Sequence, residues 1–325
     1  MNKHEAAQFV IGGMNEWTKE EGEGRASVNI ALCKYWGKRN EELNLPVTSS
    51  LSIGLPGLGA QTKVRSAARD VFFVNGTRMD SAANAAVRVF DFIRLFTEAP
   101  MEVKTESTVP LAAGLASSAS GFAALTKALN DGFGWNLSGR DLSILARLGS
   151  GSASRSVFDG FVQWHVGSRG DGMDSFAEPL EAVWPDLRMG LLVLSDKAKK
   201  IGSREAMKRT VETSKLYQQW PARVEEDLAG LQEAISQRNL TQLGRHAEQN
   251  ALGMHATMLE SWPPVIYWLP ESVEAIHRVH ALRESGVPVY FTMDAGPNVK
   301  LMFTAAEEVA VQSSFPKVRI IAPFE

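Results

Sequence analysis

Two charged side chains, Lys34 and Asp294, each directly follow an apolar segment that is typical of a β-strand. Lys34 begins the cluster KYWGKR, in which three cations and two aromatic residues stand at the end of the strand. Asp294 lies between the segment VPVYFTM and a Gly-Pro turn. A carboxylate in that position could accept a proton if a substrate came within hydrogen-bond reach. Taken alone, each pattern also has a simpler interpretation: a solvated charged loop at Lys34 and an ordinary turn at Asp294.

A third segment, SGSASR at 150–155, ends in Arg155 after a run of small and hydroxyl residues. The planar guanidinium of an arginine suits a bidentate contact with a carboxylate or a phosphate. The alternative is a helix N-terminus with an exposed arginine.

A fourth segment, PLAAGLASSASGFAA at 110–124, contains no charged residue and few large ones. We expect it to follow a strand and to begin a helix near Ser117 that runs to about Asn130, where Asp131-Gly132 would stop it. The free backbone N–H groups of such a helix start, with the hydroxyls of Ser117, Ser118 and Ser120, could bind phosphate. The alternative is a small-residue helix packed against a sheet, because GLASSAS matches neither the Walker A pattern nor GxGxxG.

The elements that must position these residues follow from the apolar periodicity. Strands are expected at 26–36, 59–67, 71–79 with an Asn75-Gly76 turn, 101–108, 160–166, 187–195, 287–293, 299–305 and 317–323. Helices are expected at 81–96 and, after a cap at Ser138, over 142–148. Further helices are expected at 203–220, 223–239, 240–260 and 272–286. This order predicts an α+β chain with a strand-rich first half, a helical second half and a division near 194–203. A cleft between two such halves is a usual ligand site.

Composition limits the partners of the chain. Its 325 residues have a net charge of −3, so we expect neither nucleic acid nor an acidic membrane as a partner. The single cysteine, Cys33, fits a reducing compartment and predicts a cytoplasmic location. The first 24 residues are expected to be an extension laid on the body of the protein. The six histidines are scattered without zinc-ligand spacing.

Six segments, in order, closely resemble the mevalonate diphosphate decarboxylases of the GHMP kinase superfamily, and the resemblance covers 27–303. They are NIALCKYWGKR, LNLPVTSSLSI, LAAGLASSAS, GSGSASRSVFDGF, GSREAMKRTVETS and DAGPNV. The resemblance implies a two-lobe α+β GHMP kinase fold with a central cleft, usually as a homodimer. It also implies an extension at 1–24, an ATP-binding lobe at 25–195 similar to ribosomal protein S5 domain 2, and a helical GHMP lobe at 196–325.

The reaction that this resemblance implies uses ATP and Mg²⁺ to phosphorylate the 3-hydroxyl of mevalonate 5-diphosphate. Phosphate and CO₂ are then lost to leave isopentenyl diphosphate. By resemblance, Asp294 accepts or orients the hydroxyl proton and Lys34 is its partner. Arg155, with Ser152 nearby, holds the carboxylate that becomes CO₂.

The resemblance also assigns the binding residues. The substrate diphosphate is expected to meet Tyr35, Lys38, Ser203 and Arg204, and Ser150, Ser152 and Arg155 are also expected to bind the substrate. The ATP phosphates are expected at Gly114, Leu115, Ala116, Ser117, Ser118 and Ser120, with Ser118 also near Mg²⁺.

The chain departs from the family in two places. Val71 stands where many members carry an arginine, and TESTVP replaces the usual NNFP before the phosphate loop. Three interpretations therefore stay open: the diphosphate decarboxylase, a sister enzyme that acts on mevalonate 5-phosphate or stops after 3-phosphorylation, and a non-catalytic nucleotide-binding relative. The joint presence of Asp294, Lys34 and Arg155 favours an enzyme.

Overall fold

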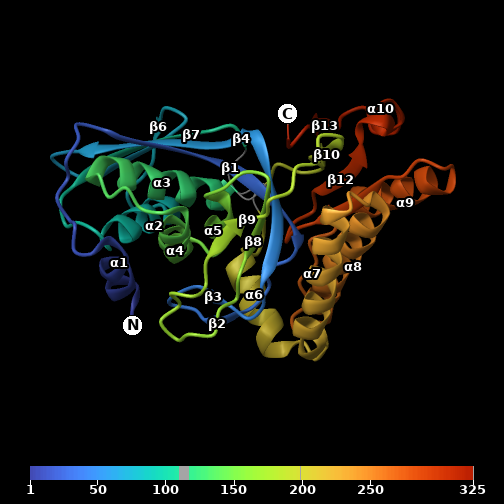
Figure 1. The fold of residues 1–325 in the computed structure, drawn as a ribbon, viewed down its shortest axis with the longest axis horizontal. Helices are drawn as coiled ribbons and strands as arrows, with labels where there is room; N and C mark the ends of the chain where they lie inside the picture. The colour runs from blue at the N-terminus through green and yellow to red at the C-terminus, as the bar shows by residue number, and fades with distance from the viewer. Residues whose placement is uncertain (110–116, 198, 325) are drawn as a thin grey trace.

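The computed structural model describes residues 1–109, 117–197 and 199–324, and Figure 1 shows two sheets that lie side by side with their helices. The larger sheet has the order β6-β5-β7-β4-β8-β9, with β1 paired to β4. Its strands are β1 (Gly22–Cys33), β4 (Ser50–Ser66), β5 (Val71–Val74), β6 (Thr77–Arg78), β7 (Met101–Ser107), β8 (Phe161–Trp164) and β9 (Ala177–Pro179). A small hairpin joins β2 (Lys38–Asn40) to β3 (Leu45–Pro46). The predicted α+β class is confirmed.

Helices cover one side of this sheet in Figure 1. They are α1 (Lys3–Ile11), α2 (Asn84–Ile93), α3 (Ser117–Phe133), α4 (Gly139–Gly149) and α5 (Ala153–Ser156). The expected cap at Ser138 is present, because its side chain accepts a hydrogen bond from the backbone N–H of Asp141. The N-terminal residues form a capped helix whose Ala6, Ala7 and Ile11 are buried, so α1 packs on the body.

The second sheet belongs to the C-terminal part and has the order β11-β12-β10-β13. Its strands are β10 (Leu187–Leu192), β11 (Tyr290–Met293), β12 (Val299–Thr304) and β13 (Arg319–Ile321). The helices of this part are α6 (Ser203–Thr213), α7 (Trp220–Ser236), α8 (Leu240–Glu260), α9 (Pro270–Glu284) and α10 (Glu308–Ser314), with short 3₁₀ turns at η1 (Leu216–Gln219) and η2 (Ala305–Glu307).

One apolar core joins the two parts of the chain. It contains Val28, Ile30 and Leu32 from β1 together with Leu231 from α7 and Met254 from α8. Burial of this much apolar surface is the main favourable term in folding. The core therefore fixes the carboxyl end of β1 against the C-terminal helices. Within residues 1–109, 117–197 and 199–324, no helix combines the length and apolar character needed to cross a membrane.

Two expected helix boundaries are wrong. The helix α3 continues through Asp131-Gly132 to Phe133, and Gly134 with a φ of +66° follows it. Gly132 serves close packing instead, since a Cβ there would lie 2.0 Å from the ring of Trp17. The helix expected over 203–220 is interrupted after Thr213, where the Ser214 hydroxyl donates to Glu260.

The position of α3 depends on glycines in the facing strand. A Cβ on Gly24 of β1 would lie 2.3 Å from the backbone oxygen of Ala124 and 2.4 Å from the backbone nitrogen of Ala128. Both contacts are to backbone atoms, which cannot swing aside. The close approach of β1 and α3 therefore requires glycine, and it sets where the amino end of α3 lies.

We predict that Gly24→Ala lowers the free energy of unfolding by about 1–3 kcal/mol, the usual cost of overpacking. The matched control is Gly170→Ala, because a Cβ at this exposed position meets no atom within 4 Å. Chemical denaturation of both variants measures the difference. Equal stability of the two variants would show that β1 and α3 can separate at little cost.

Candidate active site

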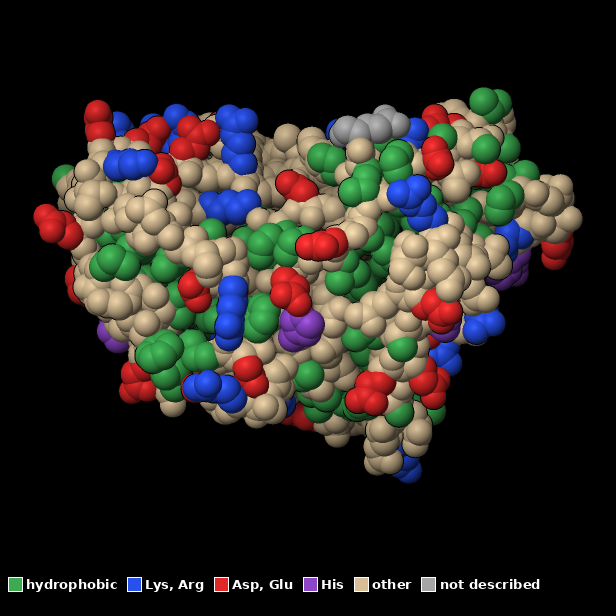
Figure 2. All heavy atoms as spheres, viewed as in Figure 1, with side chains coloured by type: hydrophobic (Ala, Val, Ile, Leu, Met, Phe, Trp, Pro, Cys, Tyr) green, Lys and Arg blue, Asp and Glu red, His purple; other side chains and the backbone are tan. Residues whose placement is uncertain are grey.

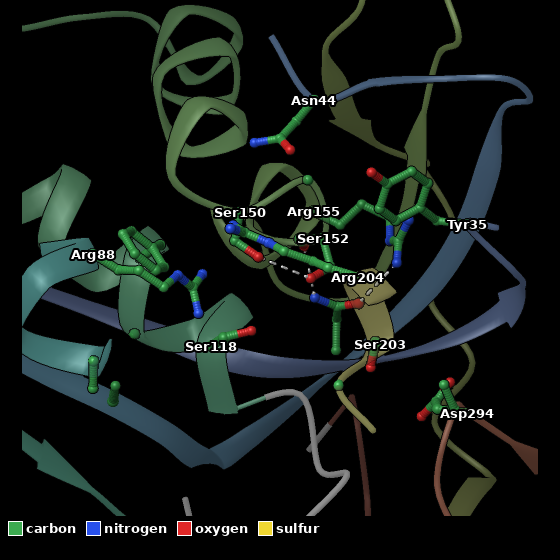
Figure 3. A pocket seen from close by; sticks show the side chains of 18 of the residues that line it. Tyr35, Asn44, Arg88, Ser118, Ser150, Ser152, Arg155, Ser203, Arg204 and Asp294 are labelled. Atoms are coloured by element: carbon green, nitrogen blue, oxygen red, sulfur yellow. Dashed lines mark hydrogen bonds between the residues drawn. The ribbon is translucent and has the colours of Figure 1, made fainter. Parts of the chain in front are cut away.

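A cavity of about 530 Å³ opens where the two parts of the chain meet. Its wall combines the end of β1, the start of α3, the segment around α5, the start of α6 and the turn after β11 (Figure 3). Ten of the residues predicted from the sequence line it: Lys34, Tyr35, Lys38, Ser118, Ser150, Ser152, Arg155, Ser203, Arg204 and Asp294. Five segments that are distant in the sequence thus contribute to a single cavity.

Asp294 lies between two lysines at one end of the cavity. The Nζ atom of Lys34 is 2.9 Å from Oδ1 of Asp294, and that of Lys300 is 3.0 Å from Oδ2. Both lysine side chains are buried, with 2% and 1% exposed, whereas the carboxylate keeps 24% exposed and faces the cavity. The structure therefore presents a carboxylate whose two oxygens each meet a cation.

The sequence interpretation missed Lys300, although a strand was expected at 299–305. Lys300 lies in β12, which pairs antiparallel with β11 so that Lys300 stands opposite Thr292. A lysine in the otherwise apolar strand VKLMFT is the available signal, because lysine is almost never fully buried without a partner.

Opposing effects set the charges of this group. Burial alone would raise the pKa of Asp294, but Lys300 and Lys34 together hold it well below its usual value. Burial lowers the pKa of Lys34 to about 8, although the attraction of Asp294 opposes this shift. Near neutral pH the carboxylate is therefore ionised and Lys34 carries its proton.

Residues of α8 hold this group from behind. Oδ1 of Asn250 accepts a hydrogen bond from the backbone N–H of Lys34 at 2.7 Å. Nε2 of His255 lies 3.1 Å from the backbone oxygen of Asp294. Burial lowers the pKa of His255 to about 3, so the ring is neutral and donates from Nε2. The C-terminal lobe thus fixes both Lys34 and Asp294.

Arg155 is a buried cation, with 2% exposed. It donates to Oγ of Ser50 and, at 3.3 Å, to Oδ1 of Asn29. In the described residues no carboxylate lies within ion-pairing distance of its guanidinium, and its Nε atom is buried without a hydrogen bond. Burial lowers the pKa of Arg155 to about 10. An unpaired buried guanidinium that lines a cavity can bind a carboxylate. Asn29 and Ser50, which orient it, were not predicted.

A second group of cations lies further along the cavity. Nζ of Lys38 donates to Oδ1 of Asn44 at 2.8 Å, and Arg204 donates to the backbone oxygen of Gly149 at 2.9 Å. The hydroxyl of Tyr35 is buried without a hydrogen-bond partner in the described residues, and burial raises its pKa. All three side chains line the cavity, and the cationic donors of Lys38 and Arg204 can bind phosphate oxygens.

Lys199 was also missed. Its Nζ donates to Oγ of Ser203 at 2.9 Å and to the backbone oxygen of Ala295 at 2.8 Å. It therefore links the start of α6 to the turn that carries Asp294.

The predicted phosphate loop is only partly described. Gly114, Leu115 and Ala116 lie outside the described residues, and Ser117 begins α3. Ser118 is exposed and lines the cavity, while Ser120 is fully buried and is not among the lining residues.

The opposite face of α3 packs on the sheet through small residues. Ala124 and Ala128 are fully buried where β1 comes closest. The packing interpretation of this segment and the cavity interpretation thus apply to different faces of one helix.

The wall formed by β5 and β7 is largely apolar. Phe72 and Val74 face the cavity from β5, whereas Val71 is half-buried and is not a lining residue. Thr105 and Ser107, from the strand before the phosphate loop, add two hydroxyls. This wall can receive an apolar or aromatic group.

The charge of the cavity differs from that of the outer surface. Figure 2 shows cationic and anionic side chains interspersed over one face of the molecule. Lining cations such as Lys34, Lys38, Arg155 and Arg204 instead accompany a single acidic lining residue, Asp294, in the described residues. The cavity is therefore the place where an anionic ligand would bind.

Comparisons with known proteins agree over most of the chain. Residues 26–177 match the model of the diphosphomevalonate decarboxylase-like N-terminal domain, and residues 189–319 match that of the mevalonate 5-diphosphate decarboxylase C-terminal domain. The chain is 35% identical to diphosphomevalonate decarboxylase mvd1 of Aspergillus fumigatus over 319 residues, covering 90% of this chain and 79% of that protein. It is 35% identical to the human diphosphomevalonate decarboxylase over 311 residues, covering 88% and 77%.

Solved structures are similar as well. The mevalonate diphosphate decarboxylase of Staphylococcus aureus has a TM-score of 0.88 and 38% identity, covering 93% of this chain and 95% of that one. That of Enterococcus faecalis has a TM-score of 0.86 and 42% identity, covering 94% and 97%. A complex of MDDEF with MVAPP, AMPPCP and magnesium has a TM-score of 0.87 and 43% identity, covering 94% and 97%.

Proposed function

The chain belongs to the mevalonate diphosphate decarboxylase family of the GHMP superfamily, and from that membership we propose how its cleft residues divide the work. The protein is an ATP- and Mg²⁺-dependent decarboxylase that converts mevalonate 5-diphosphate to isopentenyl diphosphate, ADP, phosphate and CO₂. The monophosphate, 3-kinase and non-catalytic alternatives are not favoured. The observation that carries the assignment of roles is the carboxylate of Asp294 between Lys34 and Lys300, in the cavity that Arg155 also lines.

Asp294 receives the proton of the 3-hydroxyl while the hydroxyl oxygen attacks the γ-phosphorus of ATP and ADP leaves. The low pKa of Asp294 makes it a weak base, so it orients the hydroxyl and accepts the proton as the new O–P bond forms. Phosphoryl transfer needs little activation of its nucleophile, and positioning with charge stabilisation supplies most of the rate. Lys34 and Lys300 stabilise the charge that develops on the substrate oxygen.

Arg155 holds the C1 carboxylate of the substrate. After phosphorylation, the C–O bond to the new phosphate breaks and the C1–C2 electron pair forms the double bond as CO₂ leaves. The carboxylate must lose its charge in this step. A guanidinium that also donates hydrogen bonds to Asn29 and Ser50 binds the carboxylate less tightly than one without other partners, and this suits the step. Ser152, which also lines the cavity, is assigned to the same end.

The diphosphate of the substrate is assigned to Tyr35, Lys38, Ser150, Ser203 and Arg204. Support comes from the buried free hydroxyl of Tyr35 and from the cations Lys38 and Arg204, which have no ion pair in the described part of the chain. Hydrogen bonds to charged groups contribute roughly 1.5–3 kcal/mol each, so two or three such contacts discriminate between ligands of different charge.

The ATP phosphates are assigned to the segment 114–118, with Ser118 beside Mg²⁺. Mg²⁺ is commonly bound through one or two protein groups, water and substrate phosphates. The described residues contain no cluster of three or more His, Cys, Asp or Glu side chains. The residues therefore fit a magnesium ion that is held mainly by its nucleotide. When bound, the ion neutralises charge on the phosphate oxygens.

We also propose a homodimer in the cytoplasm. Support for the dimer comes from neighbouring exposed apolar side chains, among them Leu216, Trp262 with 75% exposed and Ile266 with 66% exposed. The backbone N–H of Trp262 donates to Thr213, which ties this segment to the end of α6. Support for the location comes from Cys33, a single buried cysteine that fits a reducing compartment.

The substrate assignment is tested by CO₂ release from mevalonate 5-diphosphate and from mevalonate 5-phosphate in the presence of ATP and Mg²⁺. We expect a higher kcat/KM for the diphosphate, and Arg204→Ala should reduce that preference more than it reduces turnover of the monophosphate. Equal or faster CO₂ release from the monophosphate would overturn the assignment. Consumption of ATP without CO₂ would indicate a 3-kinase.

The role of Asp294 predicts that Asp294→Asn lowers kcat by about 10²-fold or more, as expected when a positioned acid–base group is lost. Binding of the substrate and the melting temperature should change little. Asp186→Asn, at an exposed site before β10, is the matched control and should keep full activity. Near-normal turnover of Asp294→Asn would show that Asp294 is only a turn residue.

The charge of Lys34 predicts an alkaline limit to activity. With a pKa of about 8, Lys34 is protonated below that pH and loses its proton above it, so kcat/KM should fall as the pH rises through about 8. Burial and Arg204 also lower the pKa of Lys38 to about 8. Lys38→Arg keeps a cation at position 38 and removes that titration, and the alkaline fall should persist in this variant. If the alkaline fall disappeared in Lys38→Arg, the titrating group would be Lys38.

A further inference from the structure

Arg88, a residue of α2 that the sequence interpretation did not single out, brings another cation to the cavity. Its guanidinium points into the cavity in Figure 3, and its carbon Cζ lies 4.9 Å from the centre of the Phe122 ring. The side chain is half-buried, and no described carboxylate lies within ion-pairing distance of it. Burial and then Arg204 lower the pKa of Arg88 to about 10. The guanidinium is thus held at the cavity without a protein anion to balance it.

The charges around Arg88 place it at the phosphate end of the cavity. Arg88 and Arg204 both disfavour the charged forms of Lys38 and Lys3. By contrast, the cations that act most strongly on Asp294 are Lys300 and Lys34. Arg88 therefore belongs to the group with Lys38 and Arg204, away from the hydroxyl and carboxylate end.

Arg88 also lines a second, smaller cavity. This adjoining cavity of about 140 Å³ is lined by Arg88, Arg204 and Lys3 together with exposed Asp91, which forms no ion pair with Arg88. Neither Asp294 nor Arg155 lines that smaller cavity. Arg88 and Arg204 thus lie where the main cavity adjoins the smaller one, on a part of the wall that Asp294 and Arg155 do not share.

We propose that Arg88 binds the terminal phosphate of the 5-diphosphate and thereby determines the preference for a diphosphate over a monophosphate. This inference rests on the proposed function and adds a specificity residue to it. A terminal phosphate carries the charge that distinguishes the two substrates, and it lies farthest from the reacting hydroxyl. A planar guanidinium supported on an aromatic ring is preorganised to bind it.

The test uses the full chain and compares Arg88→Gln, Arg88→Lys and the wild type. Loss of one charged contact should raise the KM for mevalonate 5-diphosphate by roughly 10–100-fold. The kcat, the KM for ATP and the KM for mevalonate 5-phosphate should each change less than about threefold, and Arg88→Lys should recover part of the loss. Arg245→Gln, which removes the same charge from an exposed position of α8, is the matched control and should behave as the wild type.

Calorimetry of mevalonate 5-diphosphate binding without ATP gives a second readout. The affinity should fall in Arg88→Gln by the same factor as the KM rises, and the melting temperature should not change. An unchanged KM for the diphosphate, an equal loss for both substrates, or a rise confined to the KM for ATP would each overturn the proposal. The last result would assign Arg88 to the nucleotide. If the wild-type chain released no CO₂, the proposed function would fail, whereas calorimetry would still test the phosphate contact.

Discussion

The ionised carboxylate of Asp294 between Lys34 and Lys300 is the interaction on which the rest of the structure depends. Taking charges out of water is costly, and a buried pair persists only when its geometry is good and its remaining hydrogen bonds are made. Lys34 ends β1 in the first lobe, whereas Asp294 and Lys300 lie on the β11–β12 hairpin of the second. The shared apolar core and the contacts from Asn250 and His255 hold these ends together. The interface between the lobes is therefore also what assembles the reactive group.

Separation of charge along the cleft divides the chemistry. The carboxylate end contains one anion between two lysines, which balances one of their two positive charges, and this anion can accept a proton. The cations Arg155, Lys38, Arg204 and Arg88 have no carboxylate partner in the described residues and can each meet a substrate anion. A net charge of −3 for the whole chain gives no hint of this arrangement. Local placement, not overall charge, determines which ligand the protein can bind.

Segments in which neighbouring residues act together could be predicted from the sequence, whereas partners from other elements could not. The end of β1 and the turn at Asp294 were found because apolar strands lead directly to charged residues, and the segment that carries Arg155 was found because small and hydroxyl residues precede the arginine. Lys300 depended on the register between β11 and β12, and Asn29 and Ser50 depended on how β1 and β4 face the arginine. Arg88 lies on an amphipathic helix, where an exposed arginine and a cavity-facing one look alike in sequence. The end of α3 was missed because Gly132 provides close packing instead of a stop.

The cleft places several cations in surroundings that disfavour their charge. Burial lowers the pKa values of Lys34 and Lys38 to about 8 and those of Arg155 and Arg88 to about 10. An anion that binds among them relieves both the repulsion and the loss of hydration, so its binding should raise these pKa values toward their usual range. Since the donors are already fixed by Asn44, Gly149, Asn29 and Phe122, little reorganisation accompanies that change. The unfavourable burial of these cations is thus the same feature that makes the cleft selective for a highly charged substrate.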